Sequence, residues 1–442
     1  MTSGPRSLED TLAARLSSRQ SHSRLRRLTT FPSTSIDFSS NSYLSLPLIP
    51  EVRRAYLAHI ESYASSTPLV PLFGSGGSRL LDGNAPPAES LERDIAAFHH
   101  APAGLLFNSG FDANVGFFSC VPQPGDIIVY DELIHASIHD GMRLSRAGRK
   151  LAFRHNSVGP DVGSDEHVAG LKCLDGVLSK LLNGEGGEDV RDGKKSVFVA
   201  VEGVYSMDGD VAALAEIVAC VKRLLPNGNG HVIVDEAHST GLFGKQGRGL
   251  VCELGLEDSV FARLHTFGKA MGSYGAIMLC SAITREYLIN YARPLIYTTA
   301  MPLSCLASIK VAYDFLASNQ ADDLRSHLRE LTGYTHDLLL SVTSRLQDAP
   351  ELLYVDPGVP RSPIIPLLTP LARSLAQHCQ ERGLILRPIV APTVPKGKER
   401  VRICLHAANT RAQIEELARA VEEWVRLQGA SASGESKNKS RL

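Results

Sequence analysis

The sequence predicts an α/β fold, with a mostly parallel sheet sandwiched by helices and a smaller α+β C-terminal domain. Two observations support this fold. Short apolar runs alternate with helical stretches between about residues 51 and 315, and beyond about residue 316 the helices become longer and the strands fewer. The chain has 442 residues, 43% of them hydrophobic, which is enough for two or three structural units with substantial cores.

Four segments are expected along the chain. They are an N-terminal arm (1–50), a large α/β domain (51–315), a small C-terminal domain (316–428) and a disordered polar tail (429–442). The candidate strands are Leu105–Phe107, Asp126–Tyr130, Val197–Val201, His231–Asp235, Arg263–Thr266 and Ala276–Cys280. Most are short and apolar, as expected for strands that are covered on both faces. We interpret residues 183–195 as a surface loop because they are polar and rich in glycine. Thr410 and Gln413 predict a capping box at the start of the last helix.

The composition argues against several classes of protein. The net charge is −1, so no electrostatic field for binding nucleic acid is expected. No apolar run reaches about 18 residues, so a membrane span is not expected. The eight cysteines are scattered, without the spacing of a zinc site, and are expected to be small core residues in a reducing compartment.

Both termini carry possible targeting signals. The first residues are rich in Ser and Arg, as in organellar presequences, but Glu9 and Asp10 argue against that interpretation. The last three residues, Ser440, Arg441 and Leu442, are a conservative variant of the Ser-Lys-Leu peroxisomal signal. We therefore expect a peroxisomal import receptor as a partner and a location in the peroxisomal matrix, with the cytoplasm or the mitochondrion as alternatives.

Two strand ends carry the strongest chemical signals. In "HVIVDEAHSTG" (231–241), Asp235 follows three β-branched residues, at the place where parallel sheets bind ligands. In "RLHTFGKAMGSYG" (263–275), Lys269 lies on a glycine turn after another strand, where a partly desolvated amine could form a Schiff base. The alternatives are a buried aspartate that caps a helix and an ordinary surface lysine.

Three further strand ends add polar groups. "LLFNSGFDAN" (105–114) places small residues at a helix start, where an anion can bind. "YDELIHASIHDG" (130–141) supplies His135, and "VEGVYSMDGD" (201–210) supplies Glu202, Ser206 and Asp208. Singly, these could be a common helix start, a structural histidine and a polar turn. Together with Asp235 and Lys269, they are the parts that a pyridoxal 5'-phosphate (PLP) site needs: a phosphate turn, an acid for the ring nitrogen and a nucleophilic lysine.

The order of these motifs is similar to that in the α-oxoamine synthases, a family of fold-type I PLP enzymes. The resemblance covers roughly residues 30–428. Beyond the motifs above, it rests on "DFSSNSYLSL" (37–46), "GSGGSRLLDGN" (74–84), "VDEAHSTGLFGKQGRG", "IYTTAMPL" (296–303) and "APTVPKGKERVRICLHAANT" (391–410). It implies a PLP-dependent transferase fold and a homodimer with the active site at the subunit interface.

The resemblance also implies roles for single residues. Lys269 would bind the cofactor covalently and act as general base, Asp235 would keep the pyridine nitrogen protonated, and His135 would stack on the ring. His238 would hydrogen-bond the phenolic oxygen of the cofactor. The other residues expected to hold the cofactor are Gly110, Phe111, Ser206, Thr266 and, from the neighbouring subunit, Thr298. Those expected to bind substrate are Asn41 and Arg402, which match positions that hold the amino-acid carboxylate, together with Arg26 and Thr393.

Within the family, the chain most resembles the branch that condenses L-alanine with pimeloyl-CoA in biotin biosynthesis. The alternatives are the sister activities, namely serine palmitoyltransferase, 5-aminolevulinate synthase and 2-amino-3-ketobutyrate CoA ligase, and a catalytically inactive partner subunit. Two departures concern substrate handling. Ala88 stands where the family often has His, and Val390 stands where several relatives have Arg; Arg387 is a possible replacement for the latter.

Overall fold

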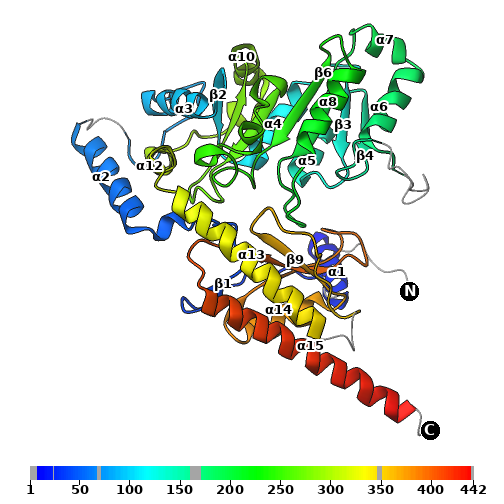
Figure 1. Ribbon diagram of the computed structural model, residues 1–442. Helices are drawn as coiled ribbons and strands as arrows, with labels where there is room; N and C mark the ends of the chain where they lie inside the picture. The colour runs from blue at the N-terminus through cyan, green and yellow to red at the C-terminus, as the bar shows by residue number, and fades with distance from the viewer. Residues whose placement is uncertain (1–6, 23, 67–70, 160–170, 346–350, 440–442) are drawn as a thin grey trace.

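The large domain is built on a seven-stranded sheet. The computed structural model describes residues 7–22, 24–66, 71–159, 171–345 and 351–439 (Figure 1). The sheet has the order β2-β8-β7-β6-β5-β3-β4. Its strands are β2 (Ala103–Phe107), β3 (Ile127–Asp131), β4 (Arg149–Phe153), β5 (Val197–Glu202), β6 (Gly230–Asp235), β7 (Ala262–Thr266) and β8 (Ala276–Cys280). Only β8 runs antiparallel to its neighbours β2 and β7, which confirms the mostly parallel sheet.

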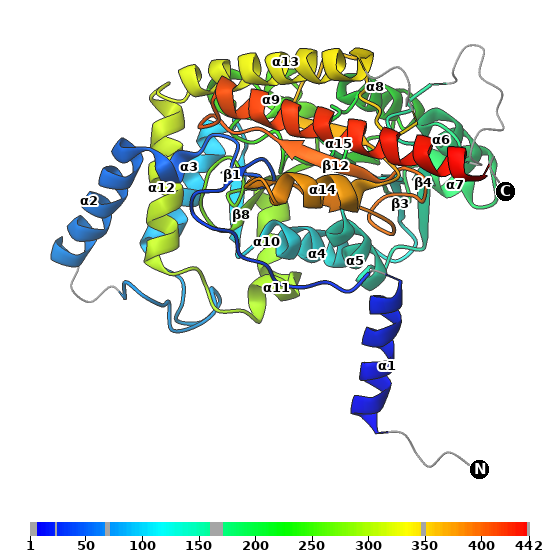
Figure 2. The ribbon, with the colours of Figure 1, turned by 90° about the horizontal axis from the view of Figure 1, so that it is seen from below.

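Helices cover both faces of this sheet (Figures 1 and 2). Along β5, Val197, Val199 and Val201 pack on one helical layer, whereas Phe198 and Ala200 pack on the other. This double burial explains why the strands are continuously apolar. The first layer consists of α6 (Leu174–Asn183), α7 (Gly187–Arg191), α8 (Leu214–Leu224) and α9 (Leu250–Glu253). The second consists of α4 (Gly110–Cys120), α5 (Ala136–Leu144), α10 (Ala282–Tyr291) and α11 (Arg293–Ile296).

The small domain has a second sheet, in which β12 (Arg400–Cys404) pairs antiparallel with β11 (Arg387–Ile389) and β9 (Ile364–Leu368). The helices α13 (Asp322–Arg345), α14 (Ala372–Gln380) and α15 (Arg411–Lys439) belong to this domain (Figure 1). Trp424 of α15 is buried in the same apolar cluster as β9, β12 and α14. The predicted capping box of α15 is present: the Thr410 N–H donates to Gln413 Oε1, and the Gln413 N–H donates to Thr410 Oγ1.

The N-terminal arm joins the small domain although it lies at the other end of the chain. Its strand β1 (Ile36–Asp37) pairs in parallel with β10 (Leu384–Ile385). The first helix, α1 (Leu8–Ser21), has no buried residue and projects away from the body in Figure 2. The remaining elements are η1 (Leu46–Leu48), α2 (Pro50–Ser66), α3 (Pro86–Phe98), η2 (Lys245–Gly247), η3 (Glu257–Ser259) and α12 (Leu303–Ala317).

The structure differs from the sequence predictions in three places. Strand β4 was missed because its first two residues, Arg149 and Lys150, are charged and exposed at the edge of the sheet. The expected loop 183–195 contains the short helix α7, whose first turn carries Glu188 and Asp189, where acidic residues favour a helix start. The last helix continues to Lys439, into the segment expected to be disordered, and residues 440–442 lie outside the described part.

The sequence predicts unpaired cysteines and no membrane-spanning helix. All eight cysteines are free thiols. No helix within the described ranges has the length and apolar character of a membrane span.

His155, which follows strand β4, contacts two carboxylates that lie at and beyond the ends of β3 and β5. Its Nδ1 lies 2.8 Å from Oδ1 of Asp131, the last residue of β3, and its Nε2 lies 2.8 Å from Oδ2 of Asp210, beyond β5. Burial alone would lower the pKa of His155, but the two hydrogen-bonded carboxylates outweigh it and raise this pKa to about 10. A charged imidazolium therefore fixes the loop 203–210, which carries Ser206.

This interaction predicts that stability falls at alkaline pH. The unfolded chain releases the His155 proton near pH 6.5, whereas the folded protein keeps it up to about pH 10. The stabilisation is therefore complete below pH 6.5 and is lost as the pH rises toward 10, by about 1.4 kcal/mol per pH unit. Urea unfolding at pH 7, 8 and 9 should show this additional decline in the wild type and not in His155→Gln. Equal pH slopes in the two proteins would contradict the assignment.

Candidate active site

Three neighbouring strands deliver polar side chains to one edge of the large sheet. Glu202 and Asp235, the last residues of β5 and β6, are direct partners in the parallel register. Asp235 in turn pairs with Leu264 of β7, two residues before Thr266. The carboxyl ends of parallel strands form the ligand-binding edge of α/β folds. The predicted convergence of these strand ends is present in the structure.

A cavity of about 270 Å³ lies at this edge. Of the site residues predicted from the sequence, those on its wall are Asn41, Gly110, Phe111, His135, Asp235, His238, Thr266 and Lys269. The other lining residues are Asn108, Ser109, Asn114, Ser137, Glu202, Ala237, Leu264, Gly268, Tyr274 and Gly275. The predicted residues that are not among those lining it are Arg26, Ser206, Thr298, Thr393 and Arg402.

Asp235 is a buried carboxylate held by two hydrogen bonds. Its Oδ2 accepts from Asn114 Nδ2 at 2.8 Å, and its Oδ1 accepts from the Ala237 N–H at 2.9 Å. Asn114 also donates to Ser137 Oγ at 2.9 Å. These donors satisfy the charge and fix the direction of the carboxylate. Sequence reasoning missed Asn114, although it follows Gly110 by four residues and thus lies one helical turn along α4.

Lys269 is half-buried on the cavity wall. Withdrawal from bulk water lowers its pKa, and the carboxylates of Asp235 and Glu202 oppose that shift. Burial raises the pKa of Glu202 well above its ordinary value, and the neighbouring Asp235 raises it further. Burial therefore favours the neutral acid at Glu202, whereas the carboxyl group of Asp235 is oriented by its two hydrogen bonds. The neutral amine is the nucleophilic form of lysine, and a lowered pKa increases the fraction of this form.

Two histidines face the same cavity and favour the neutral form. Burial lowers the pKa of His135 and lowers that of His238 well below its ordinary value. His135 is the N-cap of α5, where its Nδ1 accepts from the Ser137 N–H at 3.2 Å. His238 Nδ1 lies 2.7 Å from the hydroxyl of Tyr43. In each of the two histidines, a hydrogen bond at Nδ1 thus fixes the position of the ring.

The start of α4 suits an anion. Ser109 caps the helix, because its Oγ accepts from the Asp112 N–H at 3.0 Å, and the N–H groups of Gly110 and Phe111 lie in the first turn, where a helix has no internal acceptors for them. A Cβ on Gly110 would lie 2.5 Å from Thr266 Cγ2, so the close approach to β7 requires glycine. Thr266 Oγ1 is buried and has no hydrogen-bond partner among the described residues. A phosphate oxygen at this place would satisfy it.

Arg402 lies beside the cavity and joins two of the other predicted residues. Its Nη1 donates to the backbone oxygen of Ser206 at 2.8 Å, and its Nη2 donates to Asn41 Oδ1 at 3.0 Å. Asn41 lines the cavity, so its hydrogen bond to Arg402 places the guanidinium next to the cavity wall. This brings a bidentate donor for a carboxylate to the edge of the site.

The remaining predicted residues lie apart from the cavity. Arg26 and Thr393 are exposed. Thr298 accepts a hydrogen bond from Nδ2 of Asn108, a residue of the cavity wall, at 3.2 Å. Arg387, considered as a replacement for the missing arginine at position 390, donates to Thr29 Oγ1 of the arm at 2.7 Å.

The chain is similar to known proteins over most of its length. Residues 33–421 match the model of the family described as aminotransferase class I and II. The chain is 50% identical to 8-amino-7-oxononanoate synthase of Emericella nidulans, over 96% of this chain and 98% of the relative.

Two solved structures have the same fold. Serine palmitoyltransferase of Sphingomonas wittichii superposes with a TM-score of 0.78 at 26% identity, covering 96% of this chain and all of that one. 8-Amino-7-oxononanoate synthase of Francisella tularensis superposes with a TM-score of 0.65 at 27% identity, covering 90% and 99% of the two chains. The fold is that of the fold-type I PLP transferases. The chain therefore belongs to the aminotransferase class I and II family and, within it, to the α-oxoamine synthases.

Proposed function

We propose that the protein condenses L-alanine with pimeloyl-CoA to 8-amino-7-oxononanoate, releasing CoA and CO2, in biotin biosynthesis. The observation that carries the proposal is the cavity that brings together Lys269, Asp235 and Asn41, with Arg402 hydrogen-bonded to Asn41 beside it. We call Asn41 and Arg402 the carboxylate-binding pair. The 50% identity to a relative of that name over nearly the whole chain supports the choice of substrates. The protein is thus a PLP-dependent acyltransferase.

The residues of the cavity fit pyridoxal phosphate. The first turn of α4 and the unpaired hydroxyl of Thr266 suit the phosphate, and the oriented carboxylate of Asp235 suits the pyridine nitrogen. Lys269 is the lysine on the cavity wall that can bind the aldehyde. When bound, the cofactor supplies an electron sink for the negative charge that develops at the α-carbon of the amino acid.

The protein's own groups position the reactants and move the proton. The carboxylate of Asp235, oriented by Asn114 and the Ala237 N–H, would hold the ring nitrogen of the cofactor and favour its protonated form. Arg402 and Asn41 would receive the carboxylate of the amino acid. Burial lowers the pKa of Lys269, which increases the fraction of free amine, the form in which Nζ would accept the proton from the α-carbon. His135, on the cavity wall, would cover one face of the ring.

A second candidate is a serine palmitoyltransferase-like activity. The observation that favours it is the higher TM-score of the Sphingomonas wittichii enzyme, 0.78 against 0.65 for the Francisella tularensis synthase. The departures at Ala88 and Val390 concern substrate handling and leave Lys269 and Asp235 intact. The presence of both Lys269 and Asp235 argues against an inactive partner subunit.

A matrix of substrates tests the proposal. We expect the PLP-loaded protein to release CoA thiol with L-alanine and pimeloyl-CoA, and not with serine or glycine or with palmitoyl-, succinyl- or acetyl-CoA. Lys269→Ala should lower the rate by at least about a thousandfold, because it removes both the covalent anchor and the base. Release with serine and palmitoyl-CoA alone would favour the second candidate. No release with any pair would favour the inactive subunit.

We also propose a homodimer with the active site shared between subunits. Thr298 does not line the cavity of its own chain, which is consistent with its serving the site of the other subunit. The Ala300 N–H donates to the Gly77 oxygen, so the loop around Gly77 lies close to Thr298. In this loop, Phe73 and Leu81 are 95% and 75% exposed. Large apolar side chains exposed in one short loop are typical of a surface that a partner covers.

We propose that the protein is imported into the peroxisomal matrix through Ser440, Arg441 and Leu442, which lie outside the described residues. The position of the tripeptide at the end of a polar segment supports the proposal. Fluorescent protein carrying residues 429–442 should collect in peroxisomes. The same fusion without the last three residues should be diffuse. Diffuse signal from both fusions would remove this proposal.

A further inference from the structure

Tyr43 connects two parts of the site that come from different domains. Its hydroxyl lies 2.7 Å from Nδ1 of His238 and 3.2 Å from Oδ1 of Asn41. The same Asn41 oxygen accepts from Nη2 of Arg402 at 3.0 Å. A continuous chain of hydrogen bonds therefore runs from Arg402 on β12 of the small domain to His238, beyond the end of β6 in the large domain.

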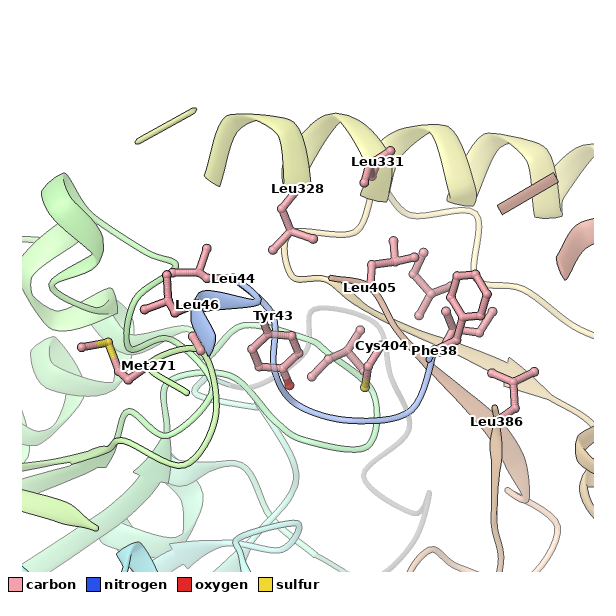
Figure 3. Close-up of a cluster of buried hydrophobic side chains, with 14 of the residues drawn as sticks. Phe38, Tyr43, Leu44, Leu46, Met271, Leu328, Leu331, Leu386, Cys404 and Leu405 are labelled. Atoms are coloured by element: carbon pink, nitrogen blue, oxygen red, sulfur yellow. The ribbon is translucent and has the colours of Figure 1, made fainter. Parts of the chain in front are cut away.

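Tyr43 is fixed in this place by its backbone and by its ring. The Ala407 N–H donates to the Tyr43 backbone oxygen at 2.7 Å, which ties the arm to the end of β12. The ring is fully buried. Figure 3 shows it between Leu46 and Met271 on the large-domain side and Cys404 on the small-domain side. The hydroxyl therefore has little freedom to leave its two partners.

The contact with Tyr43 decides how His238 presents itself to the cavity. Burial lowers the pKa of His238 well below its ordinary value, and the positive charges of Lys269 and Arg402 lower it further, as does His135. The imidazole is therefore neutral and carries one proton. His238 lines the cavity and Tyr43 does not, so Nδ1 faces Tyr43 and Nε2 is left for the cavity. The partner of Nδ1 selects which nitrogen holds the proton.

We propose that Tyr43 is a positioning residue that couples the carboxylate-binding pair, Asn41 and Arg402, to His238. Asn41 Oδ1 accepts hydrogen bonds from both Arg402 and the Tyr43 hydroxyl. A substrate carboxylate that binds Arg402 would weaken the Arg402 hydrogen bond and so change the one from Tyr43. The Tyr43 hydroxyl carries one proton, which it donates either to Asn41 Oδ1 or to Nδ1 of His238. This choice decides whether Nε2 of the neutral His238 would donate to a cofactor in the cavity or accept from it, so binding of the amino acid would alter that hydrogen bond. This inference rests on the proposed function, because it needs an amino-acid substrate and a pyridoxal cofactor in the cavity.

Tyr43→Phe tests the coupling, because it removes the hydroxyl and keeps the buried ring. Tyr313→Phe is the matched control. Tyr313 is also buried and its hydroxyl lies 2.9 Å from Nε2 of His99, but it is not among the cavity residues. Two quantities are measured on the PLP-loaded proteins: the midpoint of the pH titration of cofactor absorbance, and the dissociation constant of L-alanine from the change in the spectrum.

We expect Tyr43→Phe to shift the midpoint by about one pH unit and to weaken L-alanine binding by about tenfold, the effect of losing one buried hydrogen bond. Tyr313→Phe should match the wild type in both quantities, although either variant can unfold at a lower temperature. The coupling is wrong if Tyr43→Phe has the midpoint and the alanine affinity of the wild type. If the wild-type spectrum does not respond to L-alanine, the proposed function fails as well.

Discussion

The site depends on the placement of two carboxyl groups and an amine at the buried end of adjacent strands. The register of β5 and β6 puts Glu202 beside Asp235, and the turn after β7 adds Lys269. Charges withdrawn from water are stable only when they are paired or hydrogen-bonded. Asp235 has two hydrogen-bond donors, whereas burial raises the pKa of Glu202 and lowers that of Lys269. The fold therefore biases Glu202 and Lys269 toward their neutral forms before any ligand binds.

The site also requires that the two domains and the N-terminal arm meet at the carboxyl ends of these strands. Arg402 comes from β12, Asn41 and Tyr43 come from the arm, and His238 comes from the large domain. The arm is attached to the small domain through β1 and β10. A movement of the small domain would therefore carry the arm with it and change the contacts of the carboxylate-binding pair. His155 holds the loop that contains Ser206, and the backbone oxygen of Ser206 accepts the other hydrogen bond of Arg402.

Much of the fold could be predicted because its signals are local. Strands buried on both faces are short apolar runs, and all six predicted strands are present. Strand β4 was missed because its exposed, charged start, Arg149 and Lys150, hides the apolar pattern. The helix over 187–191 was missed because Gly186, Gly187 and the acidic residues that follow them also suit a loop.

The site was predictable at the strand ends and less so elsewhere. Asp235, Thr266 and Lys269 could be found because a parallel sheet brings its strand ends together. The hydrogen bonds of Tyr43 to His238 and of Asn114 to Asp235 could not, since each joins residues more than a hundred positions apart and the side chains are ordinary core or helix residues. The roles of Arg26 and Thr393 came from the resemblance alone, and the structure leaves both exposed.

Among the described residues, Lys269 is the lysine that lines the cavity, and we expect it to be the one that reacts with the cofactor. Borohydride reduction of the PLP-loaded protein, followed by peptide mass spectrometry, tests this expectation. One phosphopyridoxyl group per chain is expected on Lys269, and none in a parallel sample of Lys269→Ala. A modification at a different lysine, or equal labelling of many lysines, would contradict it.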